Sequence, residues 1–166
     1  MCSSDLGGTQ DWRWLVVTDR QIRAQIGAVY RRASQAIARP GSASAQDRSA
    51  EVFTDHLGEV PVLVLACYLR RGWHARSPHR ALVDATVYGS VYPAVWSLQL
   101  ALRSRGLVSC FLAAHLRHAD EVAELVGLPE DIGQAGMVAV GWPDRDDFHP
   151  ARRRPLDEVV RFDRWT

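Results

Sequence analysis

The stretch from Ser90 to Leu116, SVYPAVWSLQLALRSRGLVSCFLAAHL, constrains the fold of this chain more than any other. Its first half is apolar on almost every side. Residues 91, 95, 98 and 102 recur at helical spacing, and Trp96 and Leu100 extend the apolar surface around the helix. A helix of this kind is buried on most of its circumference. The sequence therefore predicts a core helix from Val91 to Leu102.

Signals for the start and the end of this helix lie at its two ends. Ser90 is a good N-cap, and Pro93 would then lie in the first turn, where its missing N–H costs little. Gly106 is expected to take the left-handed conformation that ends helices. The residues after it, Leu107 to Leu112, are predicted to form a short buried strand.

Composition favours one globular domain over residues 1–166, because 47% of the residues are hydrophobic. The formal net charge of +1 gives no electrostatic reason to expect binding to nucleic acid or to an anionic membrane. No apolar run reaches transmembrane length and the N-terminus lacks a signal-peptide pattern, so a cytoplasmic location is expected. Cys67 and Cys110 lie in apolar runs and are predicted to be reduced core residues.

The remaining elements follow from hydrophobic patterns and turn signals. The run PVLVLACYL lacks alternation, so we expect a strand buried on both faces. Arg70 to Arg80 is polar and reads as a surface loop. The other predicted elements are a strand over 12–18, a helix over 20–38 capped by Asp19, a helix over 46–57, a helix over 119–127, a strand over 136–142 and an edge strand over 159–165.

Three segments, in order, resemble one protein family, the nitroreductase-like flavoproteins. The central one is PAVWSLQLALRSRGL with the later EVAELVGLPED; the others are GGTQDWRWLVVTD near the start and VAVGWPDRDDFHPARRRPLDEVV near the end. The resemblance implies an α+β fold, an α/β sandwich whose central mixed or antiparallel sheet is flanked by helices. It also implies an intertwined homodimer with FMN at the interface, and a C-terminal arm, about 150–166, that crosses to the partner.

Two strand-end segments are implied as flavin contacts. Gly8, Thr9 and Gln10 precede the first strand; glycine lets backbone N–H groups approach a ligand, and the two polar side chains offer hydrogen bonds. Alone, this is an ordinary two-glycine turn. In the resemblance Gln10 matches the family's Gln, but Gly8 stands where many members have Asn, and Asp11 replaces the commoner Pro.

The second implied segment is Leu112, Ala113 and Ala114, where family members place backbone N–H groups near the flavin ring. The third candidate cofactor contact is the run of arginines in the C-terminal tail, since a guanidinium can bind phosphate through two hydrogen bonds. Arg153 aligns with the family's Arg-x-Pro, and Arg152 is taken as a helper. Without the resemblance, Leu112–Ala114 is interpreted as an ordinary strand end. The tail arginines are likewise interpreted as a hydrated basic run.

The resemblance implies an FMN-dependent oxidoreductase. NADH or NADPH would reduce the flavin, and a small electron acceptor such as a nitroaromatic or a quinone would then accept the electrons. The cofactor carries such chemistry, so no protein catalytic residue is assigned. His115 and His118 lack a third ligand at metal-binding spacing, so no metal site is assigned and both are expected to be surface or helix-start residues.

Two alternative interpretations follow from the departures from the family pattern. Gly8 in place of Asn, and the lack of the family's N-terminal basic motif, are also compatible with a member that holds or sequesters flavin without turnover. The missing motif further leads us to expect an N-terminally truncated chain, which would expose apolar surface if it dimerised poorly.

Overall fold

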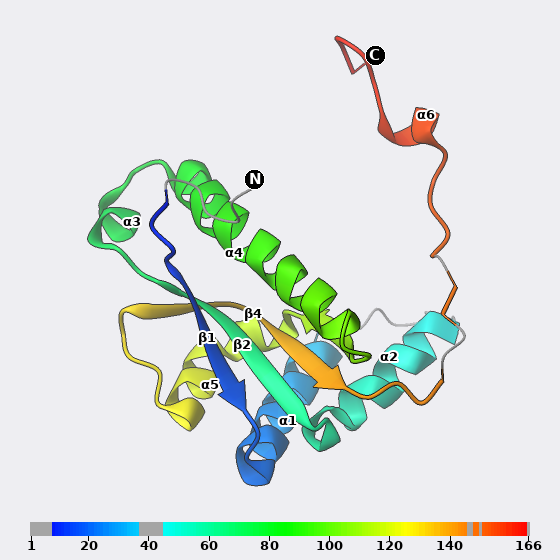
Figure 1. The fold of residues 1–166 in the computed structure, drawn as a ribbon. Coiled ribbons are helices and arrows are strands. Elements are labelled where there is room, and N and C mark those ends of the chain that lie inside the picture. The colour runs from blue at the N-terminus through cyan, green and yellow to red at the C-terminus, as the bar shows by residue number, and fades with distance from the viewer. Residues whose placement is uncertain (1–7, 37–44, 146–147, 150, 166) are drawn as a thin grey trace.

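The structure is a computed structural model, and it describes residues 8–36, 45–145, 148–149 and 151–165. Four strands and six α-helices, with two short 3₁₀ helices, follow one another along the described chain (Figure 1). In order these are β1 (Trp12–Val17), α1 (Arg20–Gln35), α2 (Ala45–Asp55), η1 (Leu57–Glu59), β2 (Val62–Leu69), α3 (Gly72–Arg76), α4 (Arg80–Arg103), β3 (Val108–Leu112), η2 (Ala114–His118), α5 (Ala119–Val126), β4 (Ile132–Gly141) and α6 (Leu156–Val159).

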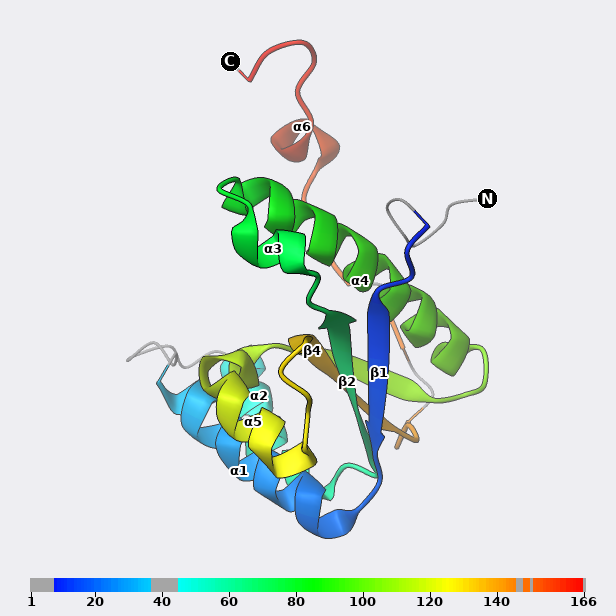
Figure 2. The ribbon, with the colours of Figure 1, turned by 90° about the vertical axis from the view of Figure 1, so that its left-hand side faces the viewer.

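The strands form a four-stranded sheet in the order β1-β2-β4-β3, and each neighbouring pair is antiparallel. Helices cover both faces: α4 lies on one side, and α1, α2 and α5 lie on the other (Figure 2). This confirms the α+β sandwich expected from the sequence. It also shows that the sheet is wholly antiparallel within the described residues.

The sheet separates two apolar cores, and β2 contributes to both. Leu63, Leu65 and Cys67 belong to the core on the side of α1 and α5. Val64 and Ala66 belong to the core beneath α4. Because successive side chains of a strand point to opposite faces, a strand covered on both sides has no polar positions. The uninterrupted apolar run therefore correctly predicts a strand buried on both faces.

Helix α4 is longer than the sequence predicted, and Ser90 is not its N-cap. The helix begins at Arg80, and Ser90 lies buried in its interior with Pro93 one turn further on. Val83 and Val87 continue the apolar face of the second half back toward the N-terminus. Burial of this face against the sheet stabilises the helix by more than the missing Pro93 N–H destabilises it. The local pattern of Ser90 and Pro93 alone suggested a helix start. Gly106 does take a left-handed conformation, with φ of 79°.

The prediction that this helix is buried on most of its circumference is wrong for a single chain. One face packs on the sheet, but the opposite face carries exposed Leu82, Trp96 and Leu100, with 62% of Trp96 accessible, and half-exposed Tyr92 lies at its border with β3. We call these four residues the outer face of α4. Within the described ranges, no helix is both long and apolar enough to cross a lipid bilayer.

The C-terminal tail also differs from expectation. In place of an edge strand over 159–165, the tail holds the short helix α6 followed by irregular chain, and it extends away from the body of the protein (Figure 1). Alternating apolar and charged residues form a strand only where a sheet edge is within reach. The polar segment Arg70–Arg80 likewise contains α3. Cys67 is buried as predicted, whereas Cys110 is exposed.

Candidate functional site

The two predicted strand-end segments both lie toward the end of the sheet at which β1 starts. β1 starts and β2 ends here, and β4 starts beside them. β3 runs toward the same end and stops at Leu112, opposite Met137 in the middle of β4. Gly8–Gln10 and Leu112–Ala114 therefore lie toward one end of the sheet but on its opposite edges. Three interstrand spacings, roughly 14 Å, separate these edges.

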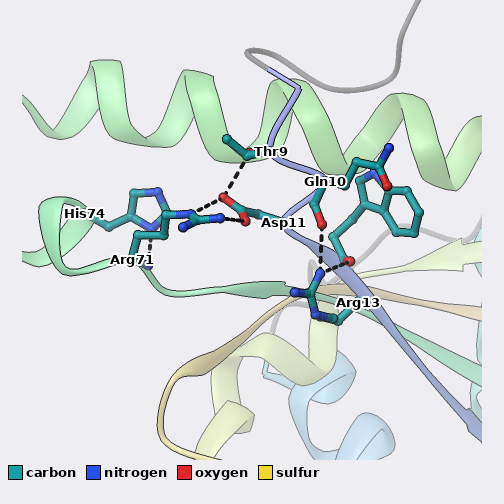
Figure 3. Close-up of polar contacts among 7 residues, drawn as sticks. Thr9, Gln10, Asp11, Arg13, Arg71 and His74 are labelled. Carbon is teal, nitrogen blue, oxygen red and sulfur yellow. Dashed lines mark hydrogen bonds and ion pairs between the residues drawn. The ribbon is translucent and has the colours of Figure 1, made fainter.

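The first segment has an unusual backbone that its neighbours hold in place. Gly8 has φ of 71° and Gln10 has φ of 48°. A non-glycine residue in this left-handed region is uncommon and persists where surrounding contacts fix it. Here the Arg13 guanidinium donates a hydrogen bond from Nη1 to the carbonyl of Gln10 at 2.7 Å (Figure 3). Gly8, Thr9 and Gln10 are all exposed, so their polar groups are accessible to a ligand.

Asp11, directly after this segment, forms a two-point ion pair with Arg71. Arg71 Nε and Nη2 donate to the two Asp11 carboxylate oxygens at 2.7 and 2.5 Å, and Thr9 Oγ1 donates to the same carboxylate at 3.0 Å (Figure 3). The hydrogen bond from Arg71 is the main cause that lowers the pKa of Asp11. No local sequence pattern indicates this pair, because its partners are sixty positions apart.

The second segment offers its backbone rather than its side chains. Leu112 is buried in the core beneath α1, so its side chain is not available to a ligand. Ala113 is exposed and Ala114, the first residue of η2, is half-buried. Because both alanines are small, a planar ligand can lie close to this strand end. The predicted role of this segment stays a prediction.

The tail arginines lie apart from both segments within one chain. Arg152 and Arg153 are exposed in the extended tail. The Arg153 guanidinium hydrogen-bonds only to the carbonyls of Ala151 and Arg152, among the contacts described. Their predicted role as phosphate ligands therefore needs the tail to reach another surface.

A row of aromatic side chains, not predicted from the sequence, links the two edges. Tyr68 packs edge-on against Tyr88 at 6.2 Å between ring centroids, Tyr88 stacks on Tyr92 at 5.3 Å, and Tyr92 meets Phe111 edge-on at 5.6 Å. The row leads from Tyr68, beside Asp11, to Phe111, which directly precedes Leu112. Its sequence signal is the pair Tyr88 and Tyr92, four residues apart on α4.

Beside the first segment, the described part of one chain does not enclose a flavin. The pocket beside the first segment is lined by Thr9, Asp11, Tyr68, Arg71 and residues of α4, and it holds only about 80 Å³. Pockets for cofactor-sized ligands measure roughly 300–1,000 Å³. The exposed hydrogen-bonding groups and small strand-end residues suit an FMN ring chemically. They fit it as one wall of a site rather than as an enclosed pocket.

One of the two histidines, His115, differs from the sequence interpretation. His115 is fully buried rather than on the surface, and neither ring nitrogen has a hydrogen-bond partner in the described part of the chain. Its burial lowers the pKa of the imidazole to about 4. His118, three residues later, is exposed. The residues that the structure describes contain no group of three or more His, Cys, Asp or Glu side chains placed to hold a metal ion.

Comparison of the chain with solved structures finds the same fold in several flavoproteins. A BluB-like flavoprotein from Clostridium difficile 630 is 20% identical with a TM-score of 0.68; the match covers 95% of this chain and 82% of that one. An iodotyrosine deiodinase bound to FMN and 3-iodo-L-tyrosine is 26% identical with a TM-score of 0.67, covering 95% and 78%. The NADPH:FMN oxidoreductase of Vibrio harveyi, in complex with NAD⁺, is 18% identical with a TM-score of 0.67, covering 99% and 64%.

Comparison at the sequence level gives two results. None of the curated proteins compared with the chain matches it. The model of the nitroreductase family matches residues 3–142, which include both strand-end segments and exclude the tail arginines. This chain therefore belongs to the nitroreductase family.

Proposed function

We propose that this chain is an FMN-dependent oxidoreductase that takes electrons from NADH or NADPH and reduces nitroaromatic, quinone or similar electron-poor acceptors. The proposal rests on one observation. The family match spans both strand-end segments, and both lie toward one end of the sheet. Structural neighbours that bind FMN and NAD⁺ support the same chemistry.

The chain's own part in this chemistry is binding and orientation. FMN, when bound, supplies the transfer of hydride and electrons. The backbone of Gly8 and the side chains of Thr9 and Gln10 would hydrogen-bond the cofactor at one edge. The backbone N–H groups of Ala113 and Ala114 would contact it at the other. Leu112 would anchor this second edge in the core, where its side chain is 6% exposed.

The proposed site is completed by a second copy of the chain. The outer face of α4 exposes four large apolar side chains, and the tail exposes Phe162 and Trp165 at 86% and 80%. Apolar surface of this extent is typical of protein interfaces. A homodimer would cover it and would let the tail bring Arg152 and Arg153 to the partner's cofactor phosphate.

The test is a visible spectrum of the purified protein after addition of FMN and desalting, followed by anaerobic NADH or NADPH. We expect a retained flavin band that either reductant bleaches, and that returns when a quinone or nitroaromatic acceptor is added. A protein that retains no flavin would contradict the proposal. The same reductant with free FMN at equal concentration is the control for uncatalysed reduction.

Gly8 favours a second candidate function, a flavin-binding protein without turnover. Many family members have Asn where this chain has Gly8, and the lost side chain removes one polar contact to the flavin. A retained band that neither NADH nor NADPH bleaches, although dithionite does, would favour this candidate.

A further inference from the structure

We propose that the Asp11–Arg71 ion pair positions Thr9 and Gln10 for ligand contact and couples this segment to α3. The proposal deepens the proposed function and rests on it. Asp11 and Arg71 are positioning residues, because they act through the segment rather than on the ligand.

The position of Asp11 makes its carboxylate a fixed anchor. Its backbone carbonyl accepts a hydrogen bond from the Leu69 N–H at 2.9 Å, beside the paired strands β1 and β2. Its side chain is only 18% exposed, compared with 42% for Arg71. A partly buried pair with a two-point guanidinium–carboxylate geometry is held more firmly than an ordinary surface ion pair.

Two contacts hold the segment, and one of them comes from this anchor. Thr9 Oγ1 donates to the Asp11 carboxylate at 3.0 Å, across the residue with the unusual backbone, Gln10. Arg13 holds the carbonyl of Gln10 from the other side. The left-handed conformation of Gln10 is thus enclosed between two sets of hydrogen bonds (Figure 3). Without the anchor, the segment is free to leave this conformation, since an unstrained backbone is available to it.

In the other direction, contacts reach α3 and the start of α4. The Arg71 N–H donates to His74 Nδ1 at 3.1 Å, and the His74 N–H donates to the Arg71 carbonyl at 2.9 Å. Arg80 at the first position of α4 donates to the His74 carbonyl at 2.9 Å. One continuous set of hydrogen bonds therefore joins Thr9 to α4, so the order of the first segment and the order of α3 are linked.

The experiment compares wild type with Asp11→Asn, Arg71→Gln, Arg71→Lys and the double variant Asp11→Asn/Arg71→Gln. A matched control is available in α1 and α5: Glu121→Gln breaks the Arg32–Glu121 pair, which has two close contacts of 2.5 and 2.6 Å and lies outside the site. Hydrogen exchange of peptides covering residues 8–12 and 69–76 is measured without ligand. The Kd for FMN and the visible circular dichroism of bound FMN are measured on the same proteins.

We expect each single loss to speed exchange in both peptides, to raise the Kd for FMN about tenfold and to alter the circular dichroism of the bound flavin. The double variant should be no worse than either single variant, because both remove the same interaction. Arg71→Lys keeps the charge without the planar fork and should recover part of the affinity. Glu121→Gln should leave all three readouts unchanged.

Two results would overturn the inference while the proposed function stood: unchanged exchange in Asp11→Asn, or faster exchange with unchanged Kd and circular dichroism. If wild type binds no FMN, the proposed function and the ligand-positioning role both fail. The exchange data then decide only whether the ion pair orders the segment and α3.

Discussion

Between pH 7 and pH 4 the protein is expected to lose about 3 kcal/mol of stability through one side chain, His115. The imidazole is fully buried in η2, which lies against α1, and its two nitrogens have no partner in the described part of the chain. A buried group without partners is far more stable neutral than charged. The pKa of His115 is accordingly lowered from 6.5 to about 4 in the folded protein.

The sign of the pH effect follows from proton binding. Above the unfolded-state pKa neither state binds a proton at His115, and its neutral form is fully compatible with the fold. As the pH falls below about 6.5, His115 binds a proton in the unfolded chain but not in the folded chain, so unfolding becomes more favourable. The loss is complete near the folded-state pKa of about 4.

The measurement is urea unfolding of wild type and His115→Leu at several pH values between 7 and 4. The variant should lack this part of the pH dependence and should be more stable than wild type at every pH, because two unsatisfied buried nitrogens are removed. Exposed His118 provides the control, because His118→Leu makes the same substitution three residues away and leaves the buried imidazole in place. If the free energy of unfolding had the same pH dependence in wild type and His115→Leu, the imidazole would not be both buried and without hydrogen-bond partners.

The second large effect is expected at the outer face of α4. Replacing both Trp96 and Leu100 by Glu should weaken self-association by at least about 100-fold and abolish retention of FMN. These side chains are 62% and 54% exposed in one chain, so the substitutions cost little in the monomer. In a dimer the same positions would bury unpaired carboxylates, which is strongly unfavourable.

Sedimentation velocity and flavin absorbance per chain read out this prediction. Val52→Glu is the matched control, because Val52 is an apolar residue of α2 that is also 61% exposed. The control should remain dimeric and yellow. A Trp96→Glu/Leu100→Glu protein that still dimerised and retained FMN would place the interface elsewhere.

The sequence predicted the elements whose signals are local. The Asp19 carboxylate caps α1, accepting hydrogen bonds from the N–H groups of Gln21 and Ile22, as expected. Gly106 ends α4 as expected, and the doubly buried strand is β2. The predicted start of α4 was wrong because Ser90 and Pro93 form a local pattern that is typical of a helix start. Their true setting depends on tertiary burial, which no local pattern encodes.

Long-range arrangement explains most of what was missed at the site. The segments before β1 and after β3 were identified, and the antiparallel sheet turns both toward one end. The Asp11–Arg71 pair and the aromatic row join residues far apart in sequence, so their pairing could not be read beforehand. His115 was misread because a lone histidine beside charged residues gives no sign of burial.

Native mass spectrometry of the protein with FMN tests the central claim, a flavin site that two chains complete. The account predicts a dimer carrying two FMN molecules, and FMN loss together with dissociation when Trp96 and Leu100 are both replaced by Glu. A monomer that binds FMN with full occupancy would contradict the composite site. A dimer that binds no FMN would contradict the proposed function itself.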